Sequence, residues 1–194
     1  MVDHQPTTDL SDELLACAAR DDPTARPTAF GELYARYVSH IYRYLLSRVS
    51  NQHDAEDLTT QTFEAALQGI AAYRGQGAFA AWLTIIARNK AINYYRTHRN
   101  RPLDTEIDFV FYSPPLDDII GQRLQISQIL AALDDLNPER AEVIRLRIFG
   151  ELSTAQTAQA MGKTEAAVKM LLYRALGDLR KRVGVINQVY EVDE

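Results

Sequence analysis

The chain has 194 residues, of which 46% are apolar and 24% charged, and its formal net charge is −5. This length allows one ordinary domain or two small ones, each with its own core. No stretch reaches the roughly 18 uninterrupted apolar residues of a membrane-spanning helix. The polar, acidic first residues differ from a secretory signal. We therefore expect a soluble, cytoplasmic protein without stable membrane insertion.

The residues that usually build metal, redox or catalytic sites are few and scattered. Cys17 is the only cysteine, which excludes an internal disulfide and a thiolate cluster for zinc. The four histidines lie far apart, without the spacing of metal ligands. Carboxylates gather near Asp54, but no convergent base and nucleophile accompany them. We expect no metal, no cofactor and no catalytic residue, and a helical enzyme is a minor alternative.

Apolar residues recur at helical spacing along nearly the whole chain, which predicts an all-α fold. In the N-terminal half, four helices are expected: over 12–20, over 30–49, from a cap at Asp54, and from Phe79 into an arginine-rich stretch. Glu56 and Asp57 lie in the first turn of the third helix, where negative charge favours the helix dipole. We predict that residues 1–101 form a first small helical domain.

An acidic segment with three prolines and no sustained period follows at residues 102–119, and we interpret it as a flexible linker. A second small helical domain is predicted over 120–183, followed by an acidic tail over 184–194. Within this domain Asn137 and Pro138 are expected to open a helix that Gly150 closes. The domain ends in a helix-turn-helix.

Residues 153–182 carry the signals of that helix-turn-helix. Ser153, followed three residues later by Gln156, has the form of a capping box, and Thr164 can cap the second helix. Gly162 suits the turn, because glycine adopts positive φ without steric cost. The second helix is expected to bury an apolar stripe: Val168, Leu171, Leu172, Ala175, Leu176, Leu179 and Val183.

The opposite face of the second helix is predicted to read duplex DNA. In a helix-turn-helix the N-terminal half of this face enters the major groove. The residues best placed to meet base edges are Glu165, Ala166, Lys169 and Met170. Thr164, Tyr173 and Arg174 share the face, and the cations expected to reach phosphates are Lys163, Arg174, Arg180 and Lys181. The alternative is a capped helical hairpin with a solvated charged face.

A second nucleic-acid site is predicted in the segment from 65 to 103, which contains no acidic residue. Its helix presents Arg88, Asn89, Asn93 and Arg96 near one face, with Arg99 beyond them and with Trp82, Tyr94 and Tyr95 interleaved. Cations combined with stacking surfaces suit unpaired bases. The preceding loop, residues 73–78 with Tyr73 and Arg74, is placed to receive a base extruded from the duplex.

The alternative for this segment is that the aromatic side chains belong to the core and the arginines form a solvated face. Core packing is favoured for Phe79 and Trp82, because their spacing matches that of Leu83 and Ile86. Function is favoured for Arg88, Asn89 and Arg96.

Two groups of residues together resemble the extracytoplasmic-function sigma factors. The first group resembles their first conserved domain: Asp54-Ala-Glu-Asp-Leu58, Gln61, Phe63, Phe79, Trp82-Leu83, Ile86-Ala-Arg-Asn89 and Arg96. The second resembles their promoter-reading C-terminal domain: Leu133, Arg140, Val143-Ile144, Leu146-Arg147, Val168-Lys169, Leu172, Arg174-Ala175-Leu176 and Leu179-Arg180. The chain departs from the family pattern at Gln156 and Thr157, and at Asn93, where many members carry Asp.

The resemblance implies an alternative sigma factor that binds core RNA polymerase and directs promoter-specific transcription initiation. The residues implied near the polymerase contact are Asp54, Glu56, Asp57, Gln61 and Phe63. The loop over 73–78 and the helix with Arg88 would melt and read the minus-ten element, and the helix from Thr164 would bind the minus-thirty-five element. The implied partners are core RNA polymerase, promoter DNA and an anti-sigma factor.

Geometry adds a condition to this interpretation. Promoter elements about 16 base pairs apart are separated by roughly 55 Å. Residues 102–119 reach at most ~60 Å when extended and average only ~24 Å as a free coil, so polymerase would have to hold them extended. The main alternative is a stand-alone helix-turn-helix repressor whose N-terminal domain dimerises or senses a ligand. It predicts a symmetric dimer on a palindrome.

Overall fold

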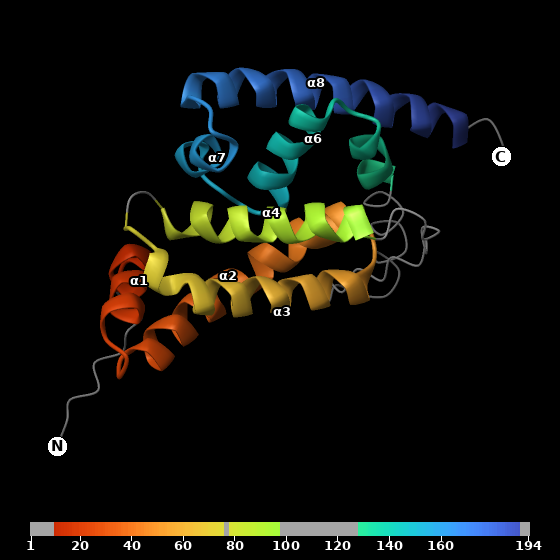
Figure 1. Cartoon of the computed structure of the whole chain (residues 1–194). Helices are drawn as coiled ribbons and strands as arrows, with labels where there is room; N and C mark the ends of the chain where they lie inside the picture. The colour runs from red at the N-terminus through yellow and green to blue at the C-terminus, as the bar shows by residue number, and fades with distance from the viewer. Residues whose placement is uncertain (1–9, 76–77, 98–127, 191–194) are drawn as a thin grey trace, which may run out of the picture.

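The computed structural model describes residues 10–75, 78–97 and 128–190, with side chains up to residue 183. Within these ranges every regular element is a helix, which confirms the predicted all-α class (Figure 1). None of the described helices combines the length and the apolar character needed to cross a membrane. The linker predicted over 102–119, Arg99 and the last four residues lie outside the described ranges.

The N-terminal half contains four α-helices and one short 3₁₀ turn: α1 (Asp12–Asp21), α2 (Arg26–Val49), α3 (Gln52–Gly69), η2 (Ile70–Ala72) and α4 (Phe79–Thr97). The prediction that Asp54 caps the third helix is wrong. The cap is Asn51, whose side-chain oxygen accepts a hydrogen bond of 3.0 Å from the backbone N–H of Asp54. Asn51 has the extended backbone that an N-cap needs, whereas Asp54 is already helical.

The core of this half is built from one apolar stripe of each helix. Its largest fully buried side chains include Tyr44, Leu33, Leu83 and Phe79. The ring of Phe79 lies 5.5 Å from that of Trp82, centre to centre, which confirms the core interpretation for these aromatic residues. The face of α4 that is not buried is therefore the one that carries its cations.

The C-terminal half consists of a helical segment over 128–134 followed by α6 (Pro138–Ile144), η3 (Arg145–Phe149), α7 (Thr154–Met161) and α8 (Glu165–Tyr190). The helix opened by Asn137 and Pro138 ends at Gly150 as predicted, but its last five residues are a π-turn. The last helix runs on to Tyr190, seven residues into the segment predicted to be a tail.

The local signals of the helix-turn-helix are confirmed. Ser153 and Gln156 form both hydrogen bonds of a capping box, at 3.1 and 2.7 Å. Gly162 ends α7 with φ of 63°, and the Thr164 hydroxyl accepts from the backbone N–H of Ala167 at 3.2 Å. The start of α8 is thus marked by a glycine with positive φ and by hydrogen bonds between residues close together in the chain.

The predicted buried stripe on α8 holds for most of its members. Val168 and Ala175 are fully buried, and Leu171, Leu172 and Leu179 pack against the core. Leu176 is 38% exposed, so the prediction for this residue is wrong. Within the described chain, α8 packs on α6 and α7, which cover it from one side, so the buried face is narrower than the sequence pattern suggests.

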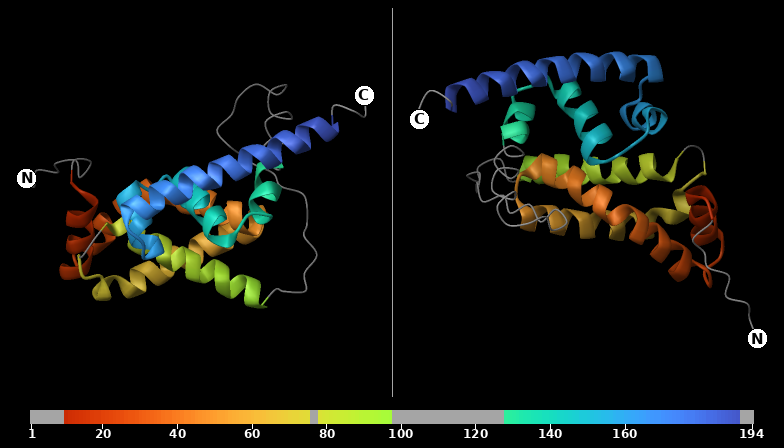
Figure 2. Two further views of the ribbon diagram at one scale, coloured as in Figure 1. Left: turned by 90° about the horizontal axis from the view of Figure 1, so that it is seen from above. Right: turned by 180° about the vertical axis from the view of Figure 1, so that it is seen from behind.

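The two halves lie against each other in layers. In Figure 1, α8 forms the outer layer, α6 and α7 come next, and α4 separates them from α3, an order that Figure 2 shows again from behind. Contacts run from α2 to η3 and from α4 to α7. One hydrogen bond joins the loop before α4 to the helix-turn-helix: the backbone N–H of Ala78 donates to Oε1 of Gln159 at 3.1 Å.

Candidate DNA- and polymerase-binding surfaces

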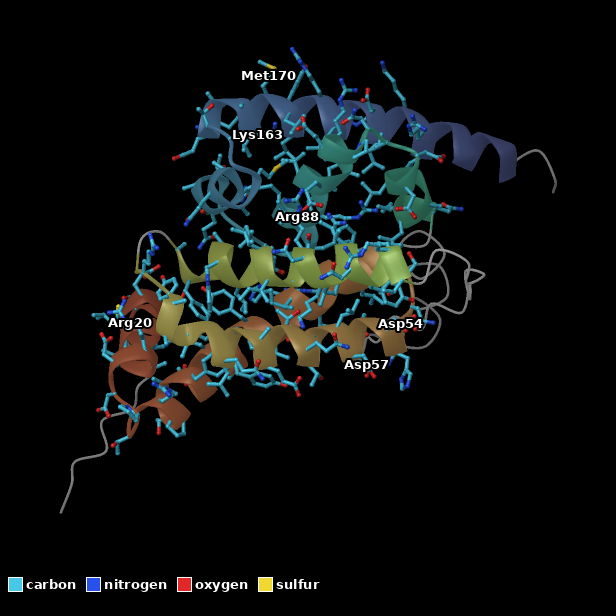
Figure 3. The ribbon with its side chains drawn as sticks, in the orientation of Figure 1. Arg20, Asp54, Asp57, Arg88, Lys163 and Met170 are labelled. Carbon is cyan, nitrogen blue, oxygen red and sulfur yellow. The ribbon has the colours of Figure 1, made fainter. Side chains whose placement is uncertain are left out.

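The predicted duplex-reading face lies on the outer side of α8, away from the N-terminal half. Met170 and Tyr173 are 53% and 78% exposed, and Figure 3 shows Met170 on the outer surface. The other exposed members of this face are Thr164, Glu165, Ala166, Lys169 and Arg174. Large apolar side chains left this open, beside cations at the start of a helix, suit contact with base edges and phosphates.

The turn between α7 and α8, which positions this face, is fixed by a backbone hydrogen bond and an ion pair. The backbone N–H of Lys163 donates to the carbonyl of Ala158 at 2.9 Å, which closes α7. The Lys163 ammonium is half-buried and pairs with Glu139 Oε1 at 2.9 Å. Lys163 thus has a carboxylate partner within its own half, whereas Arg180 and Lys181 farther along α8 are exposed.

The predicted single-strand face lies on α4, where Arg88, Asn89, Asn93 and Arg96 are all exposed. Asn89, Asn93 and Arg96 share one side of the helix, because they recur at four- and three-residue spacing, and Arg88 lies at the edge of that side. Arg88 lies in the layer between α4 and α6 (Figure 3), and its Nε is 3.4 Å from Glu142 Oε1. One end of the predicted face is therefore turned toward the other half of the molecule.

The two tyrosines interleaved with these residues make structural hydrogen bonds. The Tyr94 hydroxyl donates to Asp54 Oδ2 at 2.6 Å and so ties α4 to α3. The Tyr95 hydroxyl donates to the carbonyl oxygen of Arg48 near the end of α2. Both phenols brace α4 against its neighbours.

The loop before α4 combines a buried ring with an exposed cation. Tyr73 is 3% exposed and its ring lies 5.2 Å from that of Trp82, centre to centre, while Arg74 is exposed. Arg20 of α1, which sequence reasoning missed, donates to the Tyr73 carbonyl at 2.9 Å and pairs with Asp21 at 2.6 Å. Its hydrogen bonds lower the pKa of Asp21. A shallow pocket lies between Arg20 and Arg74.

The acidic start of α3 is open on the side away from the helix-turn-helix, where Figure 3 shows Asp54 and Asp57 at one end of the helix. Glu56, Asp57 and Gln61 are exposed. Phe63, by contrast, is 4% exposed, and its ring packs edge-on against Tyr34 at 4.7 Å, centre to centre. Phe63 therefore lies in the core beneath this surface and is not exposed on it.

A polar cluster between the two halves is the main feature that sequence reasoning missed. Glu142 of α6 is 5% exposed and accepts a hydrogen bond of 2.9 Å from the Tyr44 hydroxyl of α2. The same carboxylate pairs with Arg48 and with Arg88. We call Tyr44, Arg48, Arg88 and Glu142 the Glu142 cluster. Glu142 lies far along the chain from its three partners, so no local sequence pattern predicts the cluster.

Burial sets the protonation of this cluster. It raises the pKa of the Tyr44 phenol, which therefore remains a donor. Burial alone would lower the pKa of Arg48, but Tyr44 and Glu142 outweigh it and leave that pKa above its ordinary value. A protonated arginine and phenol thus face Glu142.

The described ranges contain no group of three or more His, Cys, Asp or Glu side chains that could hold a metal ion. The surfaces formed are instead two separate cationic faces and one acidic face.

Both halves of the chain match families of the sigma-70 type. Residues 33–101 match sigma-70 region 2, and residues 126–179 match sigma-70 region 4. The first match contains α3 and α4, and the second contains the helix-turn-helix.

Curated relatives agree. The chain is 40% identical over 159 residues to the ECF RNA polymerase sigma factor BldN of Streptomyces coelicolor, which covers 79% of this chain and 60% of BldN. It is 30% identical over 172 residues to the ECF RNA polymerase sigma factor SigX of Bacillus subtilis, which covers 85% of this chain and 89% of SigX. The chain thus spans nearly all of one relative and about three fifths of the other.

Solved structures share the arrangement of helices. A chain from the structure of CnrH in complex with the cytosolic domain of CnrY matches with a TM-score of 0.68 and 25% identity, over 90% of this chain and 97% of that chain. A chain from the complex of the sigma factor RpoE with the anti-sigma factor NepR of Bartonella quintana shares the fold at a TM-score of 0.61 and 21% identity, over 80% and 97% of the two chains. Together with the conserved regions, these matches show that the chain belongs to the extracytoplasmic-function family of RNA polymerase sigma factors and acts in promoter-directed transcription initiation.

Proposed function

We propose a division of labour between the two halves of this sigma factor. Residues 1–101 bind core RNA polymerase through the acidic start of α3 and open and read the minus-ten element through α4 and the loop over 73–78. Residues 120–183 bind the minus-thirty-five element as duplex through α8. The observation that carries this proposal is that two cationic faces lie on separate halves, one with aromatic neighbours and one on a helix-turn-helix.

The chemistry of each face suits its form of DNA. On α4, Asn89 and Asn93 offer amides for base edges and Arg96 offers a cation, and the loop before α4 adds the exposed Arg74. On α8, Lys169 and Met170 stand in the first turns, the part of a recognition helix that meets the major groove.

Net charge supports a role within a larger assembly. At −5, the chain as a whole repels DNA, and its acidic blocks offset the attraction of its basic faces. Polymerase would supply the missing cations and would hold the two halves apart. The protein then needs no catalytic group of its own, and it works in the cytoplasm, where polymerase is found.

A protein antagonist is part of the proposal. CnrH, at 25% identity, was solved with the cytosolic domain of CnrY bound. We infer that this chain also has an anti-sigma partner, which would cover the same faces that polymerase and DNA use.

Run-off transcription with core polymerase on a genomic promoter library tests the proposal. Transcripts that appear only when the chain is added, from a shared set of promoters, are the expected result. If no promoter responds while the purified chain captures palindromic duplexes as a dimer, the chain acts as a repressor instead.

A further inference from the structure

Arg20 on α1 holds the backbone at the point where the chain leaves η2 for α4. Its Nη1 donates at 2.9 Å to the carbonyl oxygen of Tyr73, a residue 53 positions later in the chain. Figure 3 shows Arg20 beside the turn that follows α3. The helix α1 precedes residues 33–101, which match sigma-70 region 2. A side chain from outside the matched region therefore contacts the start of the loop that we assign to the minus-ten element.

We propose that Arg20 is a positioning residue for promoter opening, which fixes residues 73–75 where the loop before α4 can capture a base extruded from the minus-ten element. Arg20 acts through the Tyr73 carbonyl and does not itself touch DNA. This role rests on the proposed function of the loop, and it adds α1 to the parts of the chain that open the promoter.

The direction of the Arg20 guanidinium is set by Asp21. Its Nε and Nη2 donate to the two carboxylate oxygens of Asp21 at 2.6 and 2.7 Å, while Nη1 is directed to Tyr73. A pair of parallel bonds of this kind fixes the plane of the guanidinium. The Arg20 and Asp21 side chains are 27% and 61% exposed, and exposed ion pairs add little stability. The pair therefore contributes geometry more than stability.

The end of α1 that carries Arg20 is itself anchored by α2. Arg26 donates from Nε to the carbonyl of Ala19 at 2.7 Å and from Nη2 to the carbonyl of Arg20 at 3.2 Å. Carbonyl groups in the last turn of a helix have no partner within the helix, so these bonds satisfy them. Ala16 and Ala19 are fully buried on the other side of the same turn. The backbone of Arg20 thus has a defined place from which its side chain reaches Tyr73.

The loop passes close over α1 just after this bond. Gly75 has φ of 65°, and a Cβ added there would lie 3.7 Å from Cys17 Sγ and 3.9 Å from Arg20 Nη1. Tyr73 is held on its other side by its buried ring, which lies 5.8 Å from that of Phe79, centre to centre. The exposed Arg74 lies between these fixed points, beside the shallow pocket that Arg20 also lines. The contact with α1 therefore also sets where the Arg74 side chain begins.

The chain offers a matched control for a merely stabilising contact. At the other end of α1, Arg36 Nη1 donates to the Leu10 carbonyl at 2.9 Å and pairs with Asp12 at 2.7 Å. Arg36 thus ties α1 to its neighbour with the same kinds of bond as Arg20, but far from the loop. A stabilising contact changes the amount of folded chain, whereas a positioning contact changes the rate at which each folded molecule opens the promoter.

The test uses the full chain bound to core polymerase, on a duplex promoter that the wild type transcribes in the run-off assay. The minus-ten element carries 2-aminopurine, whose fluorescence rises when the base leaves the stack. Stopped-flow traces at a series of holoenzyme concentrations give the maximal rate of opening and the concentration that supports half of it. Arg20→Met keeps the aliphatic stem but removes the donors, Arg20→Lys restores one cationic donor, and Arg36→Met is the control.

Arg20→Met should lower the maximal rate of opening about tenfold, because the loop then spends less time in the competent position. The half-maximal concentration and the affinity for core polymerase should stay unchanged, since α8 and the start of α3 are not altered. Arg20→Lys should recover much of the rate, and Arg36→Met should match the wild type. An unchanged maximal rate in Arg20→Met, or an equal loss in Arg36→Met, would overturn the proposal.

The remaining outcomes are also decisive. A higher half-maximal concentration at an unchanged maximal rate would place Arg20 in duplex binding and refute its role in opening. If circular dichroism shows that Arg20→Met has lost helix, Asp21→Asn decides, because Asp21 is exposed and its charge fixes the guanidinium. A rate about twofold lower supports the proposal, and a wild-type rate refutes it.

Failure of the positioning role and failure of the proposed function give different results. If the wild-type holoenzyme transcribes no promoter, the proposed function is wrong and the role of Arg20 is lost with it. If the wild type opens promoters and the Arg20 variants open them equally fast, only the positioning role is wrong.

Discussion

Gly162 is the residue on which the turn of the helix-turn-helix depends. Its φ is 63°, and a Cβ added there would meet no atom within 4 Å, so a side chain would cost backbone strain and nothing else. We expect Gly162→Ala to lower the free energy of unfolding by about 1–2 kcal/mol. Gly177 is the matched control, because it lies within α8 and is equally open.

At Gly177 the same substitution should have the opposite sign. Alanine in a helix interior is favoured over glycine by about 0.5–1 kcal/mol, so Gly177→Ala should raise the free energy of unfolding. Urea titrations followed by circular dichroism measure both. Equal destabilisation by the two variants would show that the positive φ of Gly162 is not what makes its substitution costly.

The arginines of α4 carry the second prediction at this scale. Changing Arg88 and Arg96 together to Ala should reduce promoter melting about tenfold or more, because each removes a contact of about 1–3 kcal/mol, while affinity for core polymerase is unchanged. Permanganate reactivity of thymines measures melting, and Lys90→Ala is the control for loss of charge on α4. Since Arg88 also pairs with Glu142, Arg96→Ala alone separates a DNA contact from the loss of this ion pair. An equal loss of core affinity would mean that this face contacts polymerase.

Among the elements, α3 begins at a different capping residue from the one that the sequence predicted. Asn51 and Asp54 are both good capping residues, and sequence alone favoured Asp54 because of the acidic turn that follows it. The structure gives the cap to Asn51 and uses Asp54 to accept a hydrogen bond from Tyr94 of α4. The Tyr94 partner of Asp54 comes 40 residues later in the chain, and a local pattern does not contain that contact.

Asn51 therefore supports a prediction for the element. Asn51→Ala removes the acceptor of the Asp54 N–H and should lower the free energy of unfolding by about 1 kcal/mol. Asn51→Asp keeps a capping oxygen and should be close to wild type. Thermal unfolding of the three proteins measures this. If the Asp variant were as unstable as the Ala variant, the cap would not be the stabilising contact.

Where sequence signals are local, they predicted the elements well. The capping box at Ser153, the positive φ at Gly162 and the cap at Thr164 each act within a few residues, and all are present. The prediction that Leu176 is buried was wrong, because burial depends on how many helices cover α8. Phe63 and Tyr73 were placed in the right elements, but their burial follows from ring packing, of Phe63 against Tyr34 on α2 and of Tyr73 against Trp82 on α4.

At the scale of the whole molecule, sequence reasoning predicted two helical halves with a cationic face on each, but not how the halves meet. The Glu142 cluster joins Glu142 to partners 54 to 98 positions earlier in the chain. Glu142 looks in sequence like an ordinary polar position of a short helix. Its role as a buried acceptor can be recognised only when α2 and α4 are placed beside α6. A buried carboxylate needs hydrogen-bond donors, and here they come from other helices.

The arrangement of the halves gives the last prediction. Two promoter elements about 16 base pairs apart are separated by roughly 55 Å, whereas the free chain holds α4 against α7. Binding to core polymerase should therefore separate the halves. Donor and acceptor dyes on cysteines at Ala35 of α2 and Lys181 of α8, in a chain with Cys17→Ser, report the separation, since both positions are exposed.

Energy transfer in this labelled chain should be high when it is free and should fall when core polymerase is added. Adding Glu142→Gln should lower the transfer of the free chain and leave the polymerase-bound value unchanged, because polymerase fixes the final geometry. Glu139→Gln should leave both values as they are. If transfer stays high in a holoenzyme that initiates transcription, the halves do not separate, and the argument from the spacing of the promoter elements is wrong.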